Sequence, residues 1–600
     1  MSSVPERSDI DEEYKWDLDS IYTSDDEWEA AYEDVAERIP ELEAYEGRAT
    51  EDPETLLELL ETMESVLREV SMVVSYASLR SSEDTRNQEY QAQAGRAEAL
   101  ASKARSAVSY LDPEIQELGR DGVEEYVEAE PALEAYEHHF DDVLRTKEHT
   151  RSAEVEAVLA DLSDVTGSPS DIYSMLANAD LEFPTVEKPD GESVEITQGN
   201  FTKLQKHPDR KFRQAVHEEF YDRWKDVRNT VGSSLKNSVK ADVKKARIRN
   251  YDTARQSALD GPNVPVEVYD NLLDTVRDNL DQLHRHAELK RQAIGADELQ
   301  MWDLYVSLTG DHGPEISYEQ AKEYIVEAVA PLGEAYQSRM AEGLEDRWVD
   351  VYENRGKRAG AFSSGTYDTQ PFIMMNYQDD AASMFTLAHE LGHSMHSELA
   401  NDAQPWHDAS YDIFTAEVAS TVNETLLTEY LLENVDDDEL RMHVLDEYLE
   451  RFRSTLFRQT MFADFELQIH EIVEADGALT PDRFDQIYGD LKAEYYAPAE
   501  TDDHIAREWM RIPHFYYNYY VYQYATGISA AAAIVERIRT DGESAAADYR
   551  DALALGGSEY PLDVLQTAGV DMTEPEPIED AMTVYESFLD EAAELLNLDA

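Results

Sequence analysis

Apolar residues recur at helical spacing through most of this sequence. Leucine, methionine and valine repeat three or four positions apart from Pro53 to Arg80, and the same spacing continues from Thr85 to Val108. The segment from Ser24 to Glu27 stands before another amphipathic stretch. It has the pattern of a capping box, in which the first and fourth residues exchange hydrogen bonds at a helix start. The sequence therefore predicts a mainly α fold.

Two short segments depart from this helical pattern. In residues 181–197, Pro189-Asp190-Gly191 lies between Thr-Val-Glu and Ser-Val-Glu-Ile, which predicts a β-hairpin or turn. The apolar stretch from Pro371 to Tyr377 predicts a short strand. We place a boundary near residue 200, which separates a helical N-terminal region, residues 1–200, from a second region, residues 201–600.

The composition limits the chemistry that the chain can use. The 600 residues include no cysteine, so any metal must be held by histidine, aspartate or glutamate. The N-terminus has no apolar signal core, and the apolar run from Ile528 to Val535 is far too short to span a bilayer. A cytoplasmic protein without a membrane partner is expected.

Acidic residues outnumber basic ones throughout the chain. There are 129 acidic and 51 basic residues, and the net charge is -78. Such a surface repels nucleic acid, so no nucleic-acid partner is expected. Self-repulsion of this size should destabilise a compact state in dilute buffer, whereas about 1 M salt reduces the screening length to roughly 3 Å. The hypothesis is a halophilic protein from an organism with a concentrated salt cytoplasm.

One short motif carries most of the chemical information. Residues 385–397 contain His389-Glu390-x-x-His393, the pattern of a zinc-peptidase helix. Four residues advance about 6 Å along a helix and slightly more than one turn, so two imidazoles at this spacing can converge on one ion. Glu390 can then reach a zinc-bound water, while the apolar neighbours of the motif predict a buried helix.

The third metal ligand has to come from elsewhere in the chain. Metzincins continue the motif with a glycine and a histidine, but those positions hold His396 and Leu399, so that class is rejected. Glu417 lies among apolar and small residues on a predicted helix over 412–430, which predicts a buried side chain. Because glutamate is rarely buried without a partner, Glu417 is the candidate third ligand. His389, His393 and Glu417 are the predicted zinc ligands. Glu424 falls on the same helix face as a candidate acceptor for a ligand imidazole.

A later aromatic segment is a candidate source of transition-state stabilisation. Residues 511–527 are rich in tyrosine and include His514. If a helix begins near Pro513, one of its faces carries His514, Tyr517, Tyr520 and Tyr524. Imidazole and phenol groups can donate hydrogen bonds to an oxyanion. A competing face carries Tyr516, Tyr519 and Tyr522, and a plain aromatic packing surface is the other interpretation.

Two further features lie close to the motif in sequence. The stretch from Gly360 to Tyr377 could provide an edge strand that pairs with an extended peptide, and Gly365 would let a ligand approach closely. An ordinary core strand and turn explain this stretch equally well. His396 follows His393 by three residues and is interpreted as a structural or supporting residue rather than a ligand.

The sequence resembles the oligoendopeptidase F group of the thimet oligopeptidase-like zinc peptidases, in a strongly acidic form of the haloarchaeal type. The resemblance is carried, in the expected order, by Tyr14 to Leu18, Phe362 to Thr369, Phe385 to Ser397, Phe414 to Thr421 and Ile512 to Gly527. It implies a mainly α, two-lobed zinc-peptidase body with a deep central channel and a small sheet beside the motif helix. It also implies an N-terminal region of the oligoendopeptidase F type in residues 1–200 and a catalytic domain in residues 201–600.

The resemblance implies roles for individual residues. One zinc ion per chain would be bound by His389, His393 and Glu417, and Glu390 would act as the general base. The oxyanion would be bound by residues on the aromatic segment, namely His514, Tyr520 and Tyr524. The expected activity is endopeptidase cleavage of short unstructured peptides. The alternatives are a peptide-binding protein without catalysis and a structural zinc site, which should have four protein ligands.

Overall fold

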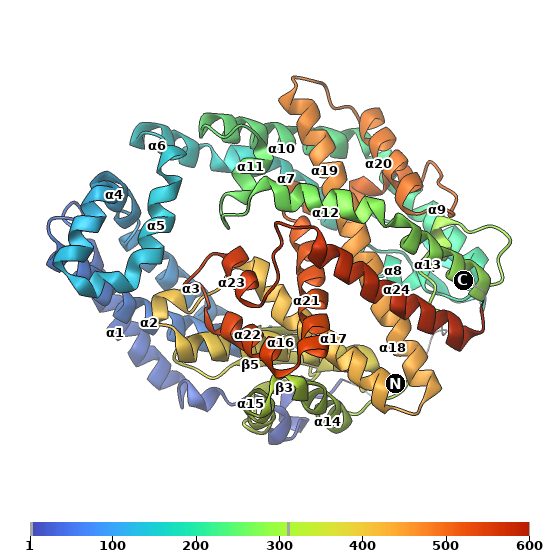
Figure 1. The fold of residues 1–600 in the computed structure, drawn as a ribbon, viewed down its shortest axis with the longest axis horizontal. Helices are drawn as coiled ribbons and strands as arrows, with labels where there is room; N and C mark the ends of the chain where they lie inside the picture. The colour runs from blue at the N-terminus through green and yellow to red at the C-terminus, as the bar shows by residue number, and fades with distance from the viewer. Residues whose placement is uncertain (1–3, 309–312, 599–600) are drawn as a thin grey trace. The chain divides into compact units, whose positions relative to one another are not determined.

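The computed structural model describes residues 4–308 and 313–598. Most of these residues are helical and the strands form two small sheets, so the predicted mainly α fold is confirmed (Figure 1). The chain forms two compact units. Unit 1 contains Met1–Glu148, Glu315–Leu427 and Asp541–Ala568, and unit 2 contains His149–Pro314, Thr428–Thr540 and Gly569–Ala600. The division at residue 200 and the implied channel stay predictions.

Both units are built mainly from α-helices. The helices of unit 1 are α1 (Asp25–Glu43), α2 (Pro53–Glu83), α3 (Gln88–Ala107), α4 (Leu111–Ala129), α5 (Glu137–Arg145), α14 (Tyr318–Ala328), α15 (Glu334–Glu345), α16 (Ala381–Ala403), the first part of α17 (Ile413–Asn434), α22 (Glu543–Ala554) and α23 (Pro561–Thr567). The helices of unit 2 are α6 (Ala153–Asp161), α7 (Ser163–Met175), α8 (Phe201–Gln205), α9 (Arg210–Asp226), α10 (Arg228–Ile248), α11 (Ala254–Leu259), α12 (Val266–Asp278), α13 (Leu280–Ala293), α18 (Asp438–Arg451), α19 (Arg458–Glu474), α20 (Pro481–Tyr495), α21 (Tyr522–Asp541) and α24 (Glu576–Leu596). Within the described residues, no helix is both long enough and apolar enough to cross a membrane.

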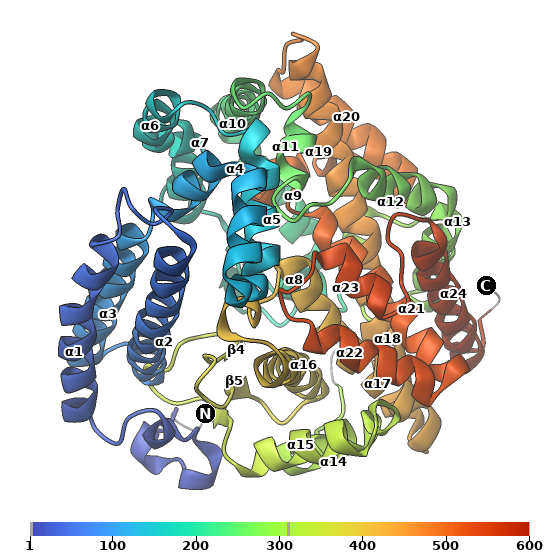
Figure 2. The same ribbon diagram turned by 60° about the vertical axis from the view of Figure 1, so that its left-hand side comes forward.

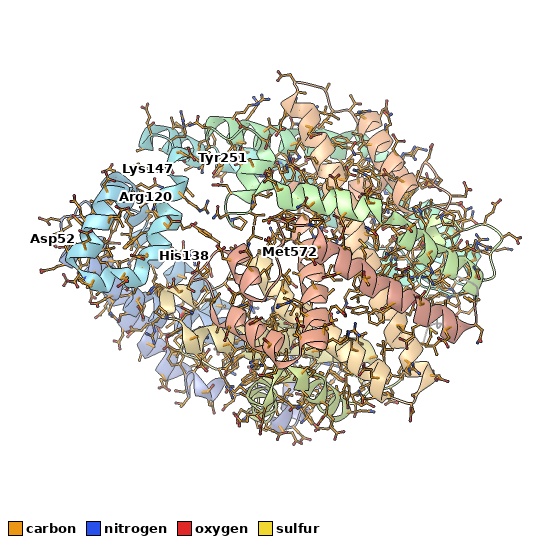
Figure 3. All side chains as sticks on the ribbon, in the orientation of Figure 1. Asp52, Arg120, His138, Lys147, Tyr251 and Met572 are labelled. Carbon is orange, nitrogen blue, oxygen red and sulfur yellow. The ribbon has the colours of Figure 1, made fainter. Side chains whose placement is uncertain are left out.

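Helices α1 and α2 begin where the sequence predicts, whereas α3 begins three residues after Thr85. The three helices lie side by side (Figure 2). The Asp52 carboxylate, labelled in Figure 3, accepts the Thr55 backbone N–H at 2.8 Å and so caps α2. Ser24 caps α1 by accepting from the Glu27 N–H at 3.3 Å. The predicted capping box is wrong in its second half, because the Glu27 carboxylate accepts from the backbone N–H and the hydroxyl of Thr23 instead.

A three-stranded sheet in unit 1 supports the motif helix. Its strands are β3 (Val349–Tyr352), β4 (Phe362–Ser364) and β5 (Phe372–Tyr377), in the order β3-β5-β4. β5 is parallel to β3 and antiparallel to β4, with Ser363 opposite Ile373. The predicted strand at 371–377 is therefore confirmed, but it is the central strand. The edge strand in this stretch is β4, which pairs with β5 alone among the described residues.

Helix α16, which carries the motif, packs on this sheet and against α17. It contacts β4 and β5 and begins after Asp380, whose carboxylate accepts the Ser383 N–H at 2.8 Å. A Cβ atom added to Gly392 would lie 2.5 Å from Ser420 Cα and 2.7 Å from the Ala419 carbonyl oxygen. Only glycine at position 392 therefore permits this close approach of the two helix backbones.

The predicted hairpin is also present, in unit 2. β1 (Thr185–Glu187) pairs antiparallel with β2 (Ser193–Glu195). The turn contains Gly191, whose φ of 89° lies in the left-handed region that favours glycine. Its backbone N–H donates to the Lys188 carbonyl at 2.9 Å. The Pro-Asp-Gly signal thus marked a real chain reversal.

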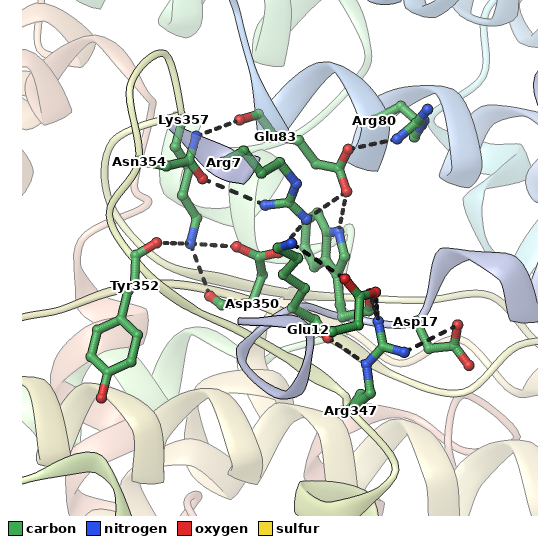
Figure 4. A network of polar contacts seen from close by, with 12 residues as sticks. Arg7, Glu12, Asp17, Arg80, Glu83, Arg347, Asp350, Tyr352, Asn354 and Lys357 are labelled. Atoms are coloured by element: carbon green, nitrogen blue, oxygen red, sulfur yellow. Dashed lines mark hydrogen bonds and ion pairs between the residues drawn. The ribbon is translucent and has the colours of Figure 1, made fainter. Parts of the chain in front are cut away.

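A buried network of charged side chains ties the start of the chain to β3 and α2 (Figure 4). The Arg7 guanidinium donates to Asp350 Oδ2 at 2.6 Å and to Glu83 Oε1 at 2.7 Å. Lys357 Nζ lies 2.6 Å from Asp350 Oδ1, and only 1% of the Lys357 side chain is exposed. The Trp16 indole N–H donates to Glu83 at 2.9 Å. The positive charges of Arg7 and Lys357 therefore both compensate the buried Asp350 carboxylate.

We expect Asp350→Ala to lower the free energy of unfolding by about 3–5 kcal/mol, because it leaves Lys357 buried without its carboxylate. Urea unfolding in about 1 M KCl measures this loss. Glu12→Gln is the matched control, since Glu12 is 72% exposed where it pairs with Arg347. The control should cost less than about 1 kcal/mol. Equal losses of unfolding free energy in the two variants would show that the buried network stabilises the fold no more than the exposed pair of Glu12 and Arg347 does.

Candidate active site

The two motif histidines face each other on α16. Their Nε2 atoms lie 3.2 Å apart, and the ring planes are nearly perpendicular, at 86°. Both side chains are half-buried, while neighbouring Leu387, Ala388 and Leu391 are fully buried in the core. The helix is therefore anchored by its apolar face, and the two imidazoles project from another face toward a shared point.

Glu417 on α17 brings a third donor to this point. Its Oε2 atom lies 3.6 Å from His389 Nε2, and the donor atoms of His389, His393 and Glu417 are all within 4.8 Å of one another. In a tetrahedral site with bonds of about 2.0–2.2 Å, ligand atoms lie about 3.3–3.6 Å apart. Two imidazole nitrogens and a carboxylate at these distances fit a divalent ion such as zinc.

The Glu417 side chain is more exposed than its apolar neighbours in the sequence predict. We expected a buried carboxylate, but 37% of the Glu417 side chain is exposed. Its neighbours Phe414, Val418 and Ala419 are buried, as the apolar pattern predicts. The carboxylate leaves the apolar core because it turns toward the histidines of α16.

Glu424 approaches the other nitrogen of His389. Its Oε1 atom lies 3.4 Å from His389 Nδ1. Burial lowers the pKa of His389, but the hydrogen bond and charge of Glu424, together with the charge of Glu417, raise it above its ordinary value on balance. A carboxylate on Nδ1 orients the ring so that Nε2 faces the other donors, which is the arrangement commonly found around metal-ligating histidines.

The Glu390 side chain is buried close to the edge strand. Burial raises the pKa of Glu390 to about 7, against the charge of His389 and the backbone N–H of Ser363, which lower it. The Ser363 and Ser394 hydroxyls are 2.9 Å apart and link β4 to α16. Ser394 also donates to the Glu390 carbonyl at 3.0 Å. Glu390 is thus held between the motif histidines and the edge strand.

His393 and His396 occupy different surroundings. Burial lowers the pKa of His393 to about 4, opposed by a backbone hydrogen bond to Ala416 on α17. His396 is fully buried, and its ring stacks on Tyr411 with the ring centroids 3.5 Å apart. The Tyr411 hydroxyl donates to the His393 carbonyl at 3.3 Å. His396 therefore supports the packing around the motif and does not join the three converging donors.

The aromatic segment of unit 2 is not the continuous helix that we predicted. A short 3-10 helix, η12 (Pro513–Tyr516), ends before Asn518 and Tyr519, whose φ angles of 45° and 60° are left-handed. Helix α21 begins only at Tyr522. The prediction was wrong because helical spacing of the aromatic residues does not reveal a local reversal of the backbone.

The turn nevertheless gathers the predicted side chains. His514 lies 5.6 Å from Tyr517, 6.5 Å from Tyr520 and 6.1 Å from Tyr524, measured between ring centroids. The rings of Tyr520 and Tyr524 are 5.4 Å apart. Burial, together with the charge of Arg458, lowers the pKa of His514, which favours its neutral form. These partly exposed rings form one polar aromatic cluster.

The competing tyrosines pack inside unit 2. The Tyr516 ring stacks on Tyr173 with the ring centroids 4.7 Å apart. Tyr519 and Tyr522 are buried, and both rings contact Tyr269 at 5.5 and 5.3 Å. Of the two faces weighed from the sequence, this one therefore contributes to the core, and the set containing His514 meets solvent.

Gly365 lies just beyond the end of β4. A Cβ atom added there would meet the Gln370 carbonyl oxygen at 3.3 Å and Pro371 Cα at 3.5 Å. The chain's own backbone is thus the close neighbour of this glycine. Close approach of a ligand to Gly365 stays a prediction.

One group of polar side chains has no counterpart in the sequence analysis. His217, Asp502 and His504, all in unit 2, bring their donor atoms within 4.8 Å of one another. Asp502 and His504 are neighbours in sequence, but His217 comes from a distant helix. The short Asp-x-His pattern was the only available signal, and it is too common to identify a site.

Comparisons with known proteins identify the family of the chain. Residues 203–584 match the model of peptidase family M3, and residues 114–183 match that of oligopeptidase F. Oligopeptidase PepF of Bacillus subtilis is 43% identical over 99% of this chain and 89% of its own length. Group B oligopeptidase PepB of Streptococcus agalactiae is 38% identical over 98% of both chains.

A solved structure supports the same assignment. The crystal structure of oligoendopeptidase-F from Enterococcus faecium is 37% identical and superposes with a TM-score of 0.73, covering 96% of this chain and 99% of that one. The family match covers more than half of the chain, and the relatives are similar over nearly their full lengths. The chain belongs to peptidase family M3, in its oligoendopeptidase F group, and is a metalloendopeptidase.

Proposed function

We propose that the protein uses zinc to hydrolyse internal bonds of short unstructured peptides, with His389, His393 and Glu417 as the metal ligands. The observation that carries the proposal is the convergence of two imidazoles and one carboxylate beside the buried Glu390 side chain. A divalent ion held there would polarise the scissile carbonyl and make water more acidic. The relatives named oligopeptidase suggest small substrates for this chain as well.

Glu390 would carry the proton during hydrolysis. It accepts a proton from the attacking water as the new carbon–oxygen bond forms, and it returns that proton to the leaving nitrogen as the carbon–nitrogen bond breaks. The Ser363 backbone N–H and the charge of His389 hold the Glu390 carboxylate in place. Substrate could extend along β4, whose outer side is unpaired among the described residues, and so be bound through its backbone.

The aromatic cluster would assist at the carbonyl oxygen. His514, Tyr520 and Tyr524 carry N–H and O–H donors, and burial favours the neutral imidazole that can donate without an added charge. Hydrogen bonds that form only when negative charge develops on the oxygen accelerate the chemical step. This role rests on the donor chemistry and on the resemblance in residues 512–527.

Glu390→Gln should lower kcat by about 10²–10⁴-fold, because the amide cannot carry the proton. The same variant should retain its metal, whereas Glu417→Ala should lose one equivalent of zinc on dialysis because a ligand is missing. A quenched fluorogenic peptide reports turnover, and elemental analysis reports the metal. Near-wild-type turnover by Glu390→Gln would exclude its role as the base.

His514→Ala, Tyr520→Phe and Tyr524→Phe test the oxyanion role. Loss of one donor should lower kcat by about 10²–10³-fold with little change in KM, because the hydrogen bond forms chiefly in the transition state. Tyr517→Phe is the control, since Tyr517 is 52% exposed in the same aromatic cluster and has no proposed role. A change in KM alone would instead indicate substrate binding.

We also propose that the protein works in the concentrated salt of a halophilic cytoplasm. With a net charge of -78, repulsion between acidic groups should relax as the screening length falls to roughly 3 Å at about 1 M salt. The melting temperature should therefore rise between about 50 mM and about 1 M KCl, and NaCl should act similarly. Full thermal stability at the lower concentration would refute this adaptation.

A further inference from the structure

Unit 2 contains a second set of metal-ligand side chains. His217 lies on α9, while Asp502 and His504 directly precede the 3-10 helix η11 (Ile505–Arg511), which packs against α9. Asp502 Oδ2 lies 3.3 Å from His504 Nδ1 and 3.7 Å from His217 Nε2. Ligand atoms of a tetrahedral zinc site are about 3.3–3.6 Å apart, so one ion could contact all three with small adjustments.

His217 is buried beside the other two donors, but its ring makes no hydrogen bond with them. Only 1% of this residue is exposed, and neither ring nitrogen has a hydrogen-bond partner among the described residues. The distance of 3.7 Å between His217 Nε2 and Asp502 is longer than a hydrogen bond. A buried imidazole without a hydrogen bond is costly. His396 shares this state, but unlike His217 it is not one of three donors that lie within 4.8 Å of one another. A cation between Nε2 and the other two donors would satisfy this nitrogen.

The Asp502 carboxylate is oriented so that one of its oxygens faces the two imidazoles and could bind a metal ion. Its Oδ1 atom accepts the backbone N–H groups of His504 at 3.0 Å and Ile505 at 2.8 Å. These two bonds fix the carboxylate at the start of η11 and turn Oδ2 toward both imidazoles. A ligand oxygen held in this way is positioned before any ion arrives.

His504 is held by a second carboxylate. Asp222 Oδ1 lies 3.3 Å from His504 Nε2, on the opposite side of the ring from Nδ1. Metal-ligating histidines commonly donate their second ring nitrogen to a carboxylate, which fixes the tautomer and the ring orientation. Asp222 would fulfil this function and favour Nδ1 as the ligand atom.

We propose that His217, Asp502 and His504 bind a second divalent transition-metal ion, for which zinc is the best match. Two imidazoles and one carboxylate suit zinc better than calcium or magnesium, which prefer oxygen ligands alone. Asp502 and His504 are 36% and 24% exposed, which gives the ion a path from solvent. The bound ion would join α9 to η11 and so stabilise unit 2.

Zinc stoichiometry of the full-length protein tests this proposal. Metal-free protein is dialysed to equilibrium with zinc in about 1 M KCl, which weakens diffuse binding to the acidic surface. Wild type should bind two ions per chain, and Asp502→Asn and His504→Gln should each bind one. The side-chain amide that Asp502→Asn introduces can still accept the backbone N–H groups through its oxygen, so η11 should be retained. Cobalt absorption provides a second readout of each bound ion.

The controls separate this site from the catalytic centre. Asp503→Asn removes a neighbouring charge that is 92% exposed and should leave two ions bound. Asp222→Asn should weaken the second ion by about 10–100-fold. Glu417→Ala should lose the catalytic ion and keep the second. One ion in wild type, or two in Asp502→Asn, would overturn the proposal and leave an imidazole–carboxylate cluster without a metal.

Discussion

The candidate active site depends on how closely the backbones of α16 and α17 approach each other. At Gly392 the distance to the Ser420 backbone leaves no room for a Cβ atom. Glu417 precedes Ser420 by three residues and Glu424 follows it by four, so both carboxylates lie on the α17 face that meets α16. They reach opposite nitrogens of the His389 ring. One packing contact therefore positions both the third donor and the residue that orients the first.

Electrostatics imposes a different constraint on the rest of the molecule. Basic residues are scarce, and several of them are placed against buried carboxylates. In unit 2 the fully buried Glu508 lies 2.6 Å from Lys492 and 2.7 Å from Arg458, and in unit 1 Asp350 is compensated by Arg7 and Lys357. Cations used in these networks cannot neutralise the surface. These two buried networks are thus charge-compensated, and the excess of acidic groups lies outside them, where repulsion between like charges destabilises a compact state.

Local chemistry was predictable where it depended on residues close in sequence. The spacing of His389 and His393 on one helix required only helical geometry, and the Pro-Asp-Gly turn of the hairpin required only backbone preference. The aromatic segment was not predictable in this way. Its rings gather as expected, but two left-handed residues, Asn518 and Tyr519, replace the predicted helix. Tyr519 itself is held there by tertiary contacts, since its backbone N–H donates to the buried Glu466 carboxylate at 2.7 Å.

Contacts between distant segments explain the remaining differences. β5 became the central strand because β3, from an earlier segment, pairs along its other side. His217 could not be related to Asp502 and His504 because no spacing rule connects α9 with the segment that precedes η11. Such groupings are set by packing of helices whose apolar faces are recognisable in the sequence but whose partners are not.

The two clusters of imidazole and carboxylate groups differ in what surrounds the donors. At the first, a buried carboxylate, Glu390, lies beside the three converging donors without being one of them, and an edge strand runs close by. At the second, the additional carboxylate, Asp222, contacts the far nitrogen of His504, where it can orient the ring but does not face the shared point of the donors. Metal-assisted hydrolysis requires a base that reaches the attacking water as well as a metal ion. The first arrangement therefore suits catalysis, whereas the second suits a cation that holds two segments together.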